Sequence, residues 1–452
     1  MSSRSRSSTD TGRAANAPDK TPQKSFYIES LGCAKNQVDS ELIIAALEKA
    51  GWTRAASDDE ARVLIVNTCG FISSAKKESI ETTLELKERH PDRRVIMVGC
   101  LSERYGADLA RELPEIDAFL GNKDPSSIVA VAEGKTPEEI AKPIVARPYE
   151  RSHLLSYPGS AYVKIAEGCD NRCTYCAIPL IRGGLASRER VEIVAEARDL
   201  LERGIRELIL IAQDLGSFGK DRGAAELVPL LSDILAVPGD FWVRMLYIHP
   251  DRFPAGLLDV VAQDRRLLPY FDLPFQHASP GMLRAMGRRS DAQRNIELLG
   301  DIRARLPGAV IRSTFLVGFP GETEEDFSRL LDFQARARFD WLGAFTYSRE
   351  EDTPAYDLPS RVPAGTARAR KQAIESAQIS ITEQALDLQV GRTLDVLIEE
   401  PVQGEEMSIG RSYLQAPDVD GLIVVRRALS AGRVVPVIIT RRNGVDLEGE
   451  TV

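Results

Sequence analysis

The sequence predicts an α/β protein with three successive regions, and three patterns support this prediction. Between residues 25 and 145, short apolar runs alternate with helical patterns at intervals of about thirty residues, as in strand–helix–strand units. Between residues 155 and 386, six strand candidates alternate with helices, which is typical of a partial (β/α)6 barrel. In residues 388–452, short strands separated by glycines predict a small all-β barrel of the OB-like kind.

The first region is expected to form an open parallel sheet. Its strand candidates are rich in β-branched or aromatic residues: Ser25–Ser30, Arg62–Asn67 and Arg94–Val98. A helix is predicted over Ser40–Ala50, where apolar residues recur on one face. Residues 1–24 are rich in Ser and Arg and lack an apolar segment, so we expect a disordered tail.

The second region follows a linker that we place at Pro143, Pro148 and Pro158. Its predicted strands are Ala161–Ile165, Glu207–Ala212, Trp242–Ile248, Tyr270–Phe275, Ile311–Val317 and Leu342–Tyr347. Helical patterns such as Val191–Arg203 separate them. In such a barrel the loops after the strands form the active face.

The third region follows a predicted helix over Thr366–Leu388. Its predicted strands are Thr393–Glu399, Leu422–Val425 and Val434–Thr440. Acidic residues outnumber basic ones in this region, whereas a barrel that binds RNA should show the opposite balance.

Composition restricts the function further. The chain has 452 residues, a net charge of -9 and a pI near 5.3, so nucleic acid is not expected to be its main partner. No apolar run approaches the ~20 residues that a membrane helix needs. Six cysteines are too few for a secreted disulfide scaffold, and a cytoplasmic metal protein fits better.

Three of these cysteines, Cys169, Cys173 and Cys176, share one segment with the spacing C-x-x-x-C-x-x-C. Ferredoxin clusters take four thiolates and pass electrons, whereas three thiolates leave one iron of a cubane free for a substrate or cofactor. Structural zinc or disulfide bonding is the alternative. Zinc sites usually add a second C-x-x-C or a His pair, and no such ligands lie nearby.

The other three cysteines, Cys33, Cys69 and Cys100, each follow a predicted strand of the first region and each neighbour a glycine. Parallel strands end at one edge of a sheet, where open α/β sheets bind ligands. We therefore expect the three thiols to form a second three-thiolate site. The alternative is three unrelated buried cysteines, because free Cys is often a small core residue.

Polar residues at the ends of the barrel strands are candidates for cofactor contacts. They are Gln213-Asp214, His249, Gln276-His277 and residues 318–322, which end in Glu322. Each of them is equally explained as a helix cap or a solvated loop residue. Arg182, just after the cysteine segment, is expected either to contact a carboxylate or to occupy a turn.

The cysteine segment resembles the signature of the radical S-adenosylmethionine enzymes. With the dispersed cysteines and the terminal barrel, nearly everything after the first 24 residues resembles the methylthiotransferase family, whose domains are a methylthiotransferase domain, a radical S-adenosylmethionine barrel and a TRAM domain. The matching segments are 30–36 (SLGCAKN), 67–72 (NTCGFI), 99–101 (GCL), 167–183 (EGCDNRCTYCAIPLIRG), 272–279 (DLPFQHAS) and 317–322 (VGFPGE).

This resemblance implies two 4Fe-4S clusters and S-adenosylmethionine. The cluster on Cys169, Cys173 and Cys176 would reduce S-adenosylmethionine to give a 5′-deoxyadenosyl radical, and the auxiliary cluster on Cys33, Cys69 and Cys100 would hold the inserted sulfur. A second S-adenosylmethionine would supply the methyl group. Tyr175 occupies the aromatic position near the adenine, and Gln213 and Glu322 are predicted cofactor contacts.

Within the family, the sequence resembles the branch that modifies the β-carbon of an aspartate in small-subunit ribosomal protein S-twelve. Residues 30–36 and 410–421 (GRSYLQAPDVDG) are similar to that branch, whereas the transfer-RNA branch usually reads G-R-x-x-x-N in the second segment. An acidic terminal barrel also suits a basic partner protein. An electron donor such as flavodoxin or ferredoxin is expected, and the sulfur donor is unknown.

Three other functions were weighed against this one. A transfer-RNA adenosine methylthiotransferase would modify an adenosine in transfer RNA and leave the ribosomal protein unmodified. An iron–sulfur scaffold or electron-transfer protein would form no 5′-deoxyadenosine from S-adenosylmethionine. A pure binding module centred on the terminal barrel leaves the six cysteines unexplained.

Overall fold

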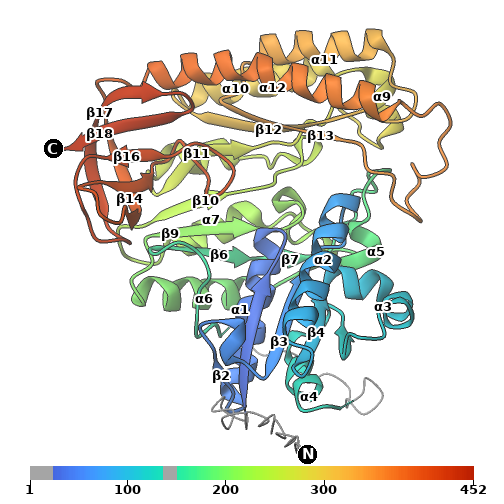
Figure 1. Cartoon of the computed structure of the whole chain (residues 1–452). Helices are drawn as coiled ribbons and strands as arrows, with labels where there is room; N and C mark the ends of the chain where they lie inside the picture. Colours follow the sequence, from blue (N-terminus) through green and yellow to red (C-terminus); the bar gives the residue numbers. More distant parts are fainter. Residues whose placement is uncertain (1–23, 136–149) are drawn as a thin grey trace, which may run out of the picture.

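The computed structural model describes residues 24–135 and 150–452, so the predicted tail, apart from Lys24, and the linker prolines Pro143 and Pro148 lie outside the described residues. Figure 1 shows the N-terminal elements in blue beside a green-to-orange sheet, with a red barrel at the far end of that sheet. The described strands form a five-stranded sheet, a six-stranded sheet, a closed five-stranded barrel and a two-stranded ribbon. The predicted fold class is confirmed.

The N-terminal sheet is parallel and has the strand order β2-β1-β3-β4-β5. Its strands are β1 (Ser25–Ser30), β2 (Thr53–Arg54), β3 (Val63–Thr68), β4 (Arg94–Gly99) and β5 (Ala118–Leu120). Its helices are α1 (Ala34–Lys49), α2 (Ser73–Arg89), α3 (Cys100–Glu112) and α4 (Ile128–Ala132). The three predicted strands are confirmed, whereas β2 and β5 are short edge strands with no buried residue and were not predicted. Helix α1 begins earlier than predicted, directly after Cys33.

The central sheet is open, because β6 and β13 lie at opposite ends of the order β13-β12-β11-β10-β9-β6. Its strands are β6 (Ser160–Lys164), β9 (Glu207–Ile211), β10 (Trp242–Met245), β11 (Leu267–Asp272), β12 (Val310–Val317) and β13 (Trp341–Thr346). Its helices are α5 (Ile178–Arg182), α6 (Arg190–Glu202), α7 (Leu227–Leu235), α8 (Leu257–Gln263), α9 (Pro280–Ala285), α10 (Ala292–Arg305) and α11 (Glu324–Ala337). A short ribbon pairs β7 (Ala166–Glu167) with β8 (Ala186–Ser187).

All six predicted barrel strands are present, with ends that differ by one residue in four strands and by three residues in β10 and β11. β10 ends at Met245, before the predicted Ile248, because Tyr247 has a left-handed backbone with a φ of +67°. β11 lies three residues earlier than predicted, since the Pro274 region was mistaken for strand. The residues that follow these strands therefore lie on longer loops than we expected.

The C-terminal barrel follows the long helix α12 (Ala364–Asp387), which Figure 1 shows in orange along the upper edge of the molecule. Its strands are β14 (Thr393–Pro401), β15 (Ser408–Arg411), β16 (Ile423–Val425), β17 (Val434–Asn443) and β18 (Asp446–Thr451). They close in the order β14-β15-β16-β18-β17. β15 and β18 were not predicted, because each is short and contains glycine and charged residues.

The concave face of the central sheet is filled by the other two regions. Arg244 on β10 is fully buried, pairs with Glu207 at 2.6 Å, and donates hydrogen bonds to two backbone oxygens of the C-terminal loop. Glu207 also pairs with Arg411 of β15 at 2.8 Å. Because these charges are desolvated, each requires its partner. The C-terminal barrel is therefore fixed against the sheet by charged contacts as well as by apolar packing.

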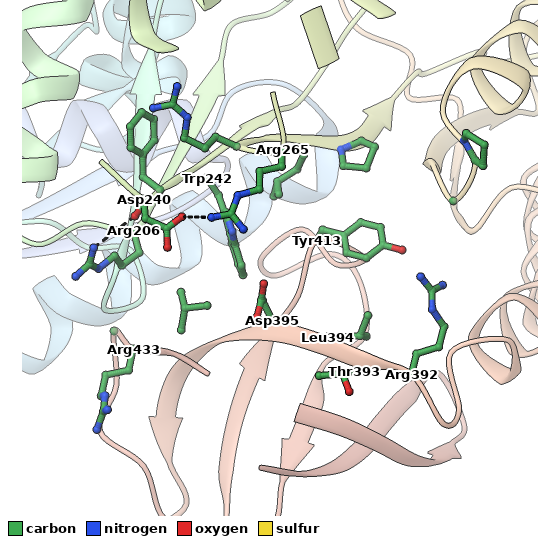
Figure 2. A pocket seen from close by; sticks show the side chains of 18 residues that line it. Arg206, Asp240, Trp242, Arg265, Arg392, Thr393, Leu394, Asp395, Tyr413 and Arg433 are labelled. Atoms are coloured by element: carbon green, nitrogen blue, oxygen red, sulfur yellow. Dashed lines mark hydrogen bonds and ion pairs between the residues drawn. The ribbon is translucent and has the colours of Figure 1, made fainter. Parts of the chain in front are cut away.

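A groove of about 740 Å³ lies between the C-terminal barrel and the strand ends where β9 and β10 begin. Figure 2 shows Arg206, Arg265, Arg392 and Arg433 around it, with Trp242 at its wall. It lies at the amino ends of the strands, whereas the cysteine segment follows the carboxyl end of β6. This groove is therefore separate from the predicted reaction site.

Asp340 gives the folded chain a pH dependence that can be measured. Burial raises the pKa of Asp340 to about 6, although its carboxylate accepts a hydrogen bond from the Ile311 backbone N–H at 2.8 Å. Because the pKa of Asp340 is higher in the folded chain than in the unfolded chain, the folded chain binds more protons. Protonated Asp340 therefore stabilises the folded chain fully below the unfolded pKa of 3.8, and this stabilisation is lost as pH rises through about 6.

We expect the metal-free protein to gain about 2 kcal/mol of unfolding free energy between pH 7.5 and 4.5 relative to Asp340→Asn. Chemical denaturation of both proteins across that range measures the difference. If the unfolding free energies of the wild type and of Asp340→Asn change equally with pH, the prediction is wrong.

Candidate active site

Three cysteines lie together at one edge of the N-terminal sheet. Cys33 precedes α1, Cys69 follows β3, and Cys100 is the first residue of α3. Since β1, β3 and β4 are neighbouring parallel strands, their carboxyl ends bring the three residues to the same edge. A Cβ atom on Gly32 would lie 3.4 Å from the Cys69 Sγ, so the first loop touches the second. The predicted convergence is present, and the role of the three thiols as cluster ligands stays a prediction.

The thiols at this edge are free and differ in exposure. Cys33 is exposed, Cys69 is half-buried and Cys100 is buried. Burial raises the pKa of Cys69 to about 12 and also raises the pKa of Cys100. Iron would have to displace these protons on binding, as metal ligands generally require. The predicted alternative of disulfide bonds does not hold, because all six cysteines are free.

The glycines beside these cysteines have a packing role that the sequence only partly predicted. A Cβ atom on Gly70 would lie 2.8 Å from the Cys100 backbone oxygen, and Gly99 has a φ of +96°. Both positions therefore need glycine to let the loops after β3 and β4 approach each other. We expected these glycines to leave room for a cluster, but the closest contacts are between the loops themselves.

The segment with Cys169, Cys173 and Cys176 follows β7 at the carboxyl end of β6. A Cβ atom on Gly168, where φ is +65°, would lie 1.9 Å from the Gly184 oxygen, so only glycine fits there. Burial raises the pKa of Cys169 to about 11 and that of Cys176 to about 12. The loop is thus built tightly, its three cysteines are half-buried, and burial desolvates the thiols of Cys169 and Cys176.

Neighbouring strand ends hold this loop in place. The Asn171 side chain donates a hydrogen bond to Asp214, after β9, at 2.8 Å, and accepts one from Arg252 at 2.6 Å. The Thr174 backbone N–H and hydroxyl donate to backbone oxygens near the end of α9, at 3.1 and 2.7 Å. Asp214 was a predicted cofactor contact or cap, and here its carboxylate accepts bonds from the loop and from Ser217 at 2.6 Å.

The two groups of cysteines are linked by Arg182, the last residue of α5. Its guanidinium donates to the Asp39 carboxylate at 2.8 Å, to Glu167 at 2.9 Å, and to the Cys100 sulfur at 3.3 Å. Cys100 also packs against Ala177, the residue after Cys176. Cys100 therefore lies beside α5, the helix that follows the second cysteine loop. Arg182 contacts carboxylates, which is one of the two roles expected for it.

Buried charges surround this contact. Lys164 at the end of β6 pairs with both Asp39 and Glu167. Burial opposes ionisation of Glu167, but Lys164 and Arg182 outweigh it and lower the pKa of Glu167 to about 2. None of Asp39, Lys164 or Glu167 was predicted as a site residue, although a charge inside the apolar run of β6 could have signalled Lys164.

Tyr175 lies beside the cysteines but turns toward an apolar cluster. Its ring packs against the cluster that contains Met286 and Phe319, and its hydroxyl accepts a hydrogen bond from Arg288 at 3.0 Å. Burial raises the pKa of Tyr175. These contacts hold the loop from the barrel side, and the predicted contact with S-adenosylmethionine stays a prediction.

Gln213 is the predicted cofactor contact that the structure favours most. Both its amide nitrogen and its amide oxygen are buried and have no hydrogen-bond partner in the described residues. Gln213 lies two residues after the end of β9, next to Asp214, which accepts a hydrogen bond from the cysteine loop. Unsatisfied buried polar atoms are rare in folded proteins and mark a missing partner. A polar ligand at the mouth of the barrel would supply that partner.

Glu322 differs from Gln213 because its carboxylate is already engaged. It accepts hydrogen bonds from Arg370 at 2.9 Å and from the Gly318 backbone N–H, and it lies 3.2 Å from His277. These contacts hold the loop before α11 and the loop after β11 together. His249, another candidate, accepts a hydrogen bond from the Asp251 backbone at 3.2 Å as a cap.

The arrangement of donors suits a cluster better than a single ion. In the described residues, no three His, Cys, Asp or Glu side chains converge on one metal-ion position. A cubane takes one thiolate at each of three irons, so its ligands surround a larger volume. That either set of three thiols holds a cubane stays a prediction.

Comparison with protein families divides the chain into three matched segments. Residues 25–121 match the uncharacterized protein family UPF0004, residues 163–333 match the radical SAM superfamily, and residues 390–452 match the TRAM domain. The exact domain boundaries stay a prediction. Superfamily membership implies S-adenosylmethionine and iron–sulfur cluster chemistry in the central segment.

Full-length relatives decide the family. The chain is 42% identical to a ribosomal protein uS12 methylthiotransferase RimO of Treponema denticola, over 93% of this chain and 99% of that protein. It is 44% identical to the enzyme of the same name from Heliobacterium modesticaldum, over 94% and 95% of the two chains. The chain belongs to the RimO methylthiotransferase family. The RimO of Myxococcus xanthus is 40% identical over 96% of this chain and 93% of its own.

Solved structures support the fold alone. The radical S-adenosylmethionine methyltransferase TsrM of Kitasatospora setae has a TM-score of 0.56 and 17% identity over 74% of this chain and 77% of TsrM. RimO family membership and this fold agree with the predicted radical S-adenosylmethionine barrel. No helix among residues 24–135 and 150–452 combines the length and the apolar character that crossing a membrane would require.

Proposed function

We propose that this RimO-family chain transfers a methylthio group to the β-carbon of an aspartate of ribosomal protein uS12. This is the small-subunit ribosomal protein S-twelve named in the sequence analysis. The main support is the proximity of the two cysteine groups. Arg182, which follows the second cysteine loop, donates a hydrogen bond to the Cys100 sulfur, and Cys100 belongs to the same apolar cluster as Ala177. One group would serve radical generation and the other sulfur delivery. The names of the full-length relatives support uS12 as substrate and do not favour a transfer-RNA adenosine.

The residues of this chain would divide the work between two sites. Cys169, Cys173 and Cys176 would hold the cluster that binds S-adenosylmethionine, with the unsatisfied Gln213 amide as a contact for that cofactor. The cysteines at the N-terminal sheet edge would hold a second 4Fe-4S cluster. The bound groups supply the radical and sulfur chemistry, while the chain positions them.

The chain would also exclude water from the proposed active site. The concave face of the central sheet is closed by α1 and by the C-terminal loop, and buried ion pairs line the remaining interior. A 5′-deoxyadenosyl radical needs such a closed site, because solvent and side reactions would otherwise quench it. Flavodoxin or ferredoxin is the proposed electron donor, and the cytoplasm, where ribosomal proteins are assembled, is the proposed location.

Mass spectrometry of a strain that lacks the gene tests the substrate. We expect uS12 to lose the mass of one methylthio group at an aspartate, while methylthio-adenosine in transfer RNA stays unchanged. Reintroduction of the wild-type chain should restore the modification, and the Cys33→Ala variant should not. Loss of the transfer-RNA modification with intact uS12 modification would contradict the proposal.

A further inference from the structure

Lys35 is a buried cation without a counter-ion. It lies in the first turn of α1, two residues after Cys33, and only 9% of it is exposed. Its ammonium nitrogen sits 3.6 Å from the centre of the Tyr247 ring. In the part of the chain that the structure describes, this nitrogen has no hydrogen bond and no ion pair.

The neighbouring buried cations are all paired, so Lys35 is an exception. Lys164 pairs with Asp39 and Glu167, and Arg182 contacts the same two carboxylates. Arg312 on β12 lies 3.5 Å from Asp272 and 3.3 Å from a carboxylate of the C-terminal loop. A buried charge without a partner is unfavourable, and a ring face compensates only part of the lost hydration. The Lys35 ammonium is therefore free to pair with an anion that enters beside Tyr247.

The position of Lys35 connects the two parts of the proposed active site. Tyr247 follows β10 at the mouth of the barrel, and its backbone N–H donates to Asp272 at 3.2 Å. Asp272 is thereby engaged by Tyr247 and by Arg312, and it forms no ion pair with Lys35. Cys33 lies two residues before Lys35, directly ahead of α1. The ammonium thus lies between a predicted ligand of the auxiliary cluster and the barrel mouth.

We propose that Lys35 binds the side-chain carboxylate of the aspartate that the enzyme modifies, an inference that rests on the proposed function. A charge-assisted hydrogen bond from an ammonium to a carboxylate is strong and directional. The β-carbon of aspartate is bonded directly to that carboxyl carbon, so holding the carboxylate fixes the reacting carbon. Tyr247 keeps the lysine side chain in place beneath the substrate.

This geometry makes Lys35 a specificity residue. An asparagine at the target position lacks the negative charge, and a glutamate places its carboxylate one carbon farther from the β-carbon. Lys35 would discriminate against both side chains before any bond is broken. Its second role would be to keep the substrate backbone at a set distance from the cysteine edge.

Binding measurements with the reconstituted holoenzyme under anaerobic conditions test this proposal. The partners are native uS12 and uS12 with the target aspartate replaced by asparagine, each titrated against wild-type enzyme and Lys35→Met. We expect Lys35→Met to bind native uS12 about 10- to 100-fold more weakly, the range expected for loss of one charged hydrogen bond. The asparagine form should bind both enzymes with equal affinity.

Two controls separate this role from others. Lys77→Met removes an exposed lysine on α2, whose side chain is 75% exposed, and should change neither affinity. Iron content of Lys35→Met should equal that of the wild type. A loss of iron in this variant would overturn the proposal, because Lys35 would then serve the cluster at Cys33.

Other outcomes are equally decisive. If Lys35→Met weakens both forms of uS12 alike, Lys35 shapes the site and does not hold the carboxylate. If Lys35→Met does not fold, the wild-type enzyme decides alone, since equal affinities for native and asparagine uS12 overturn the proposal. An enzyme that modifies uS12 yet binds the two forms equally keeps the proposed function and loses only this inference. An enzyme that leaves uS12 unmodified removes the proposed function itself.

Discussion

Replacement of Cys33, Cys69 and Cys100 by alanine is expected to abolish methylthio transfer and to leave cleavage of S-adenosylmethionine intact. The three residues lie at one edge of the N-terminal sheet, on loops separate from the segment that holds Cys169, Cys173 and Cys176. Iron content of anaerobically purified protein should fall from about eight to about four per chain, because each cubane holds four irons. Formation of 5′-deoxyadenosine with a chemical reductant should persist at a rate near that of the wild type.

The matched control is the Cys169, Cys173 and Cys176 triple alanine variant, which removes the other group. It should also retain about four irons, yet form no 5′-deoxyadenosine, since one 4Fe-4S cluster remains but the radical site is lost. The two variants thus have the same iron content and opposite cleavage activity. Unchanged iron in the first variant, or loss of cleavage in it, would contradict the assignment of the N-terminal cysteines.

The placement of the cysteines could be predicted from the sequence because parallel sheets impose it. Cys69 and Cys100 follow strands that are buried on both faces and are recognisable as continuous apolar runs, and Cys33 follows the half-buried β1. Once the strands are parallel, their carboxyl ends must coincide. In contrast, β15 and β18 are short and contain glycine and charged residues, and their strand character comes from closure of the barrel.

The charged interior could not be predicted in the same way. Lys164 and Glu207 each lie within an apolar strand, and the sequence does not indicate the partner that each one meets in another domain. Those partners are Asp39 on α1 and Arg411 on β15, more than a hundred residues away in the chain. A charged residue in a buried strand signals that a partner exists but not which one.

The acidic residues of the C-terminal barrel outnumber its basic ones, which we took to suit a basic partner protein. Glu399, Asp420 and Glu448 are instead largely buried and pair with arginines, at 3.3 Å for Asp420 with Arg312. The groove in Figure 2 has several arginines around it. The acidic count is therefore weaker support for a basic protein partner than the sequence indicated.

Replacement of Arg182 by methionine is expected to destabilise the protein and to separate the two cysteine groups. Arg182 is bonded to the Asp39 carboxylate, the Glu167 carboxylate and the Asn36 side chain, and its own side chain is only 3% exposed. Asp39 and Glu167 stabilise the charged form of Arg182 and raise its pKa, although burial alone would lower it. Removing the cation leaves Lys164 to neutralise two desolvated carboxylates.

We expect the unfolding free energy of Arg182→Met to fall by about 3 kcal/mol, the lower end of the range for breaking a buried pair, because Glu167 is 30% exposed. Chemical denaturation of the metal-free protein at pH 7 measures this loss. Arg190→Met is the matched control, since Arg190 pairs with Asp233 at the surface with 36% and 40% exposure, and it should cost less than about 1 kcal/mol.

A double variant shows whether the loss comes from the unpaired charge. Adding Asp39→Asn to Arg182→Met should cost less than the sum of the two single losses, because the second change removes one of the carboxylates that the first left unpaired. Methylthio transfer should still be absent, since Arg182 also contacts the Cys100 sulfur at 3.3 Å and ties that edge to α5. Equal destabilisation by Arg182→Met and Arg190→Met would mean that this interior charge network does not hold the two cysteine groups together.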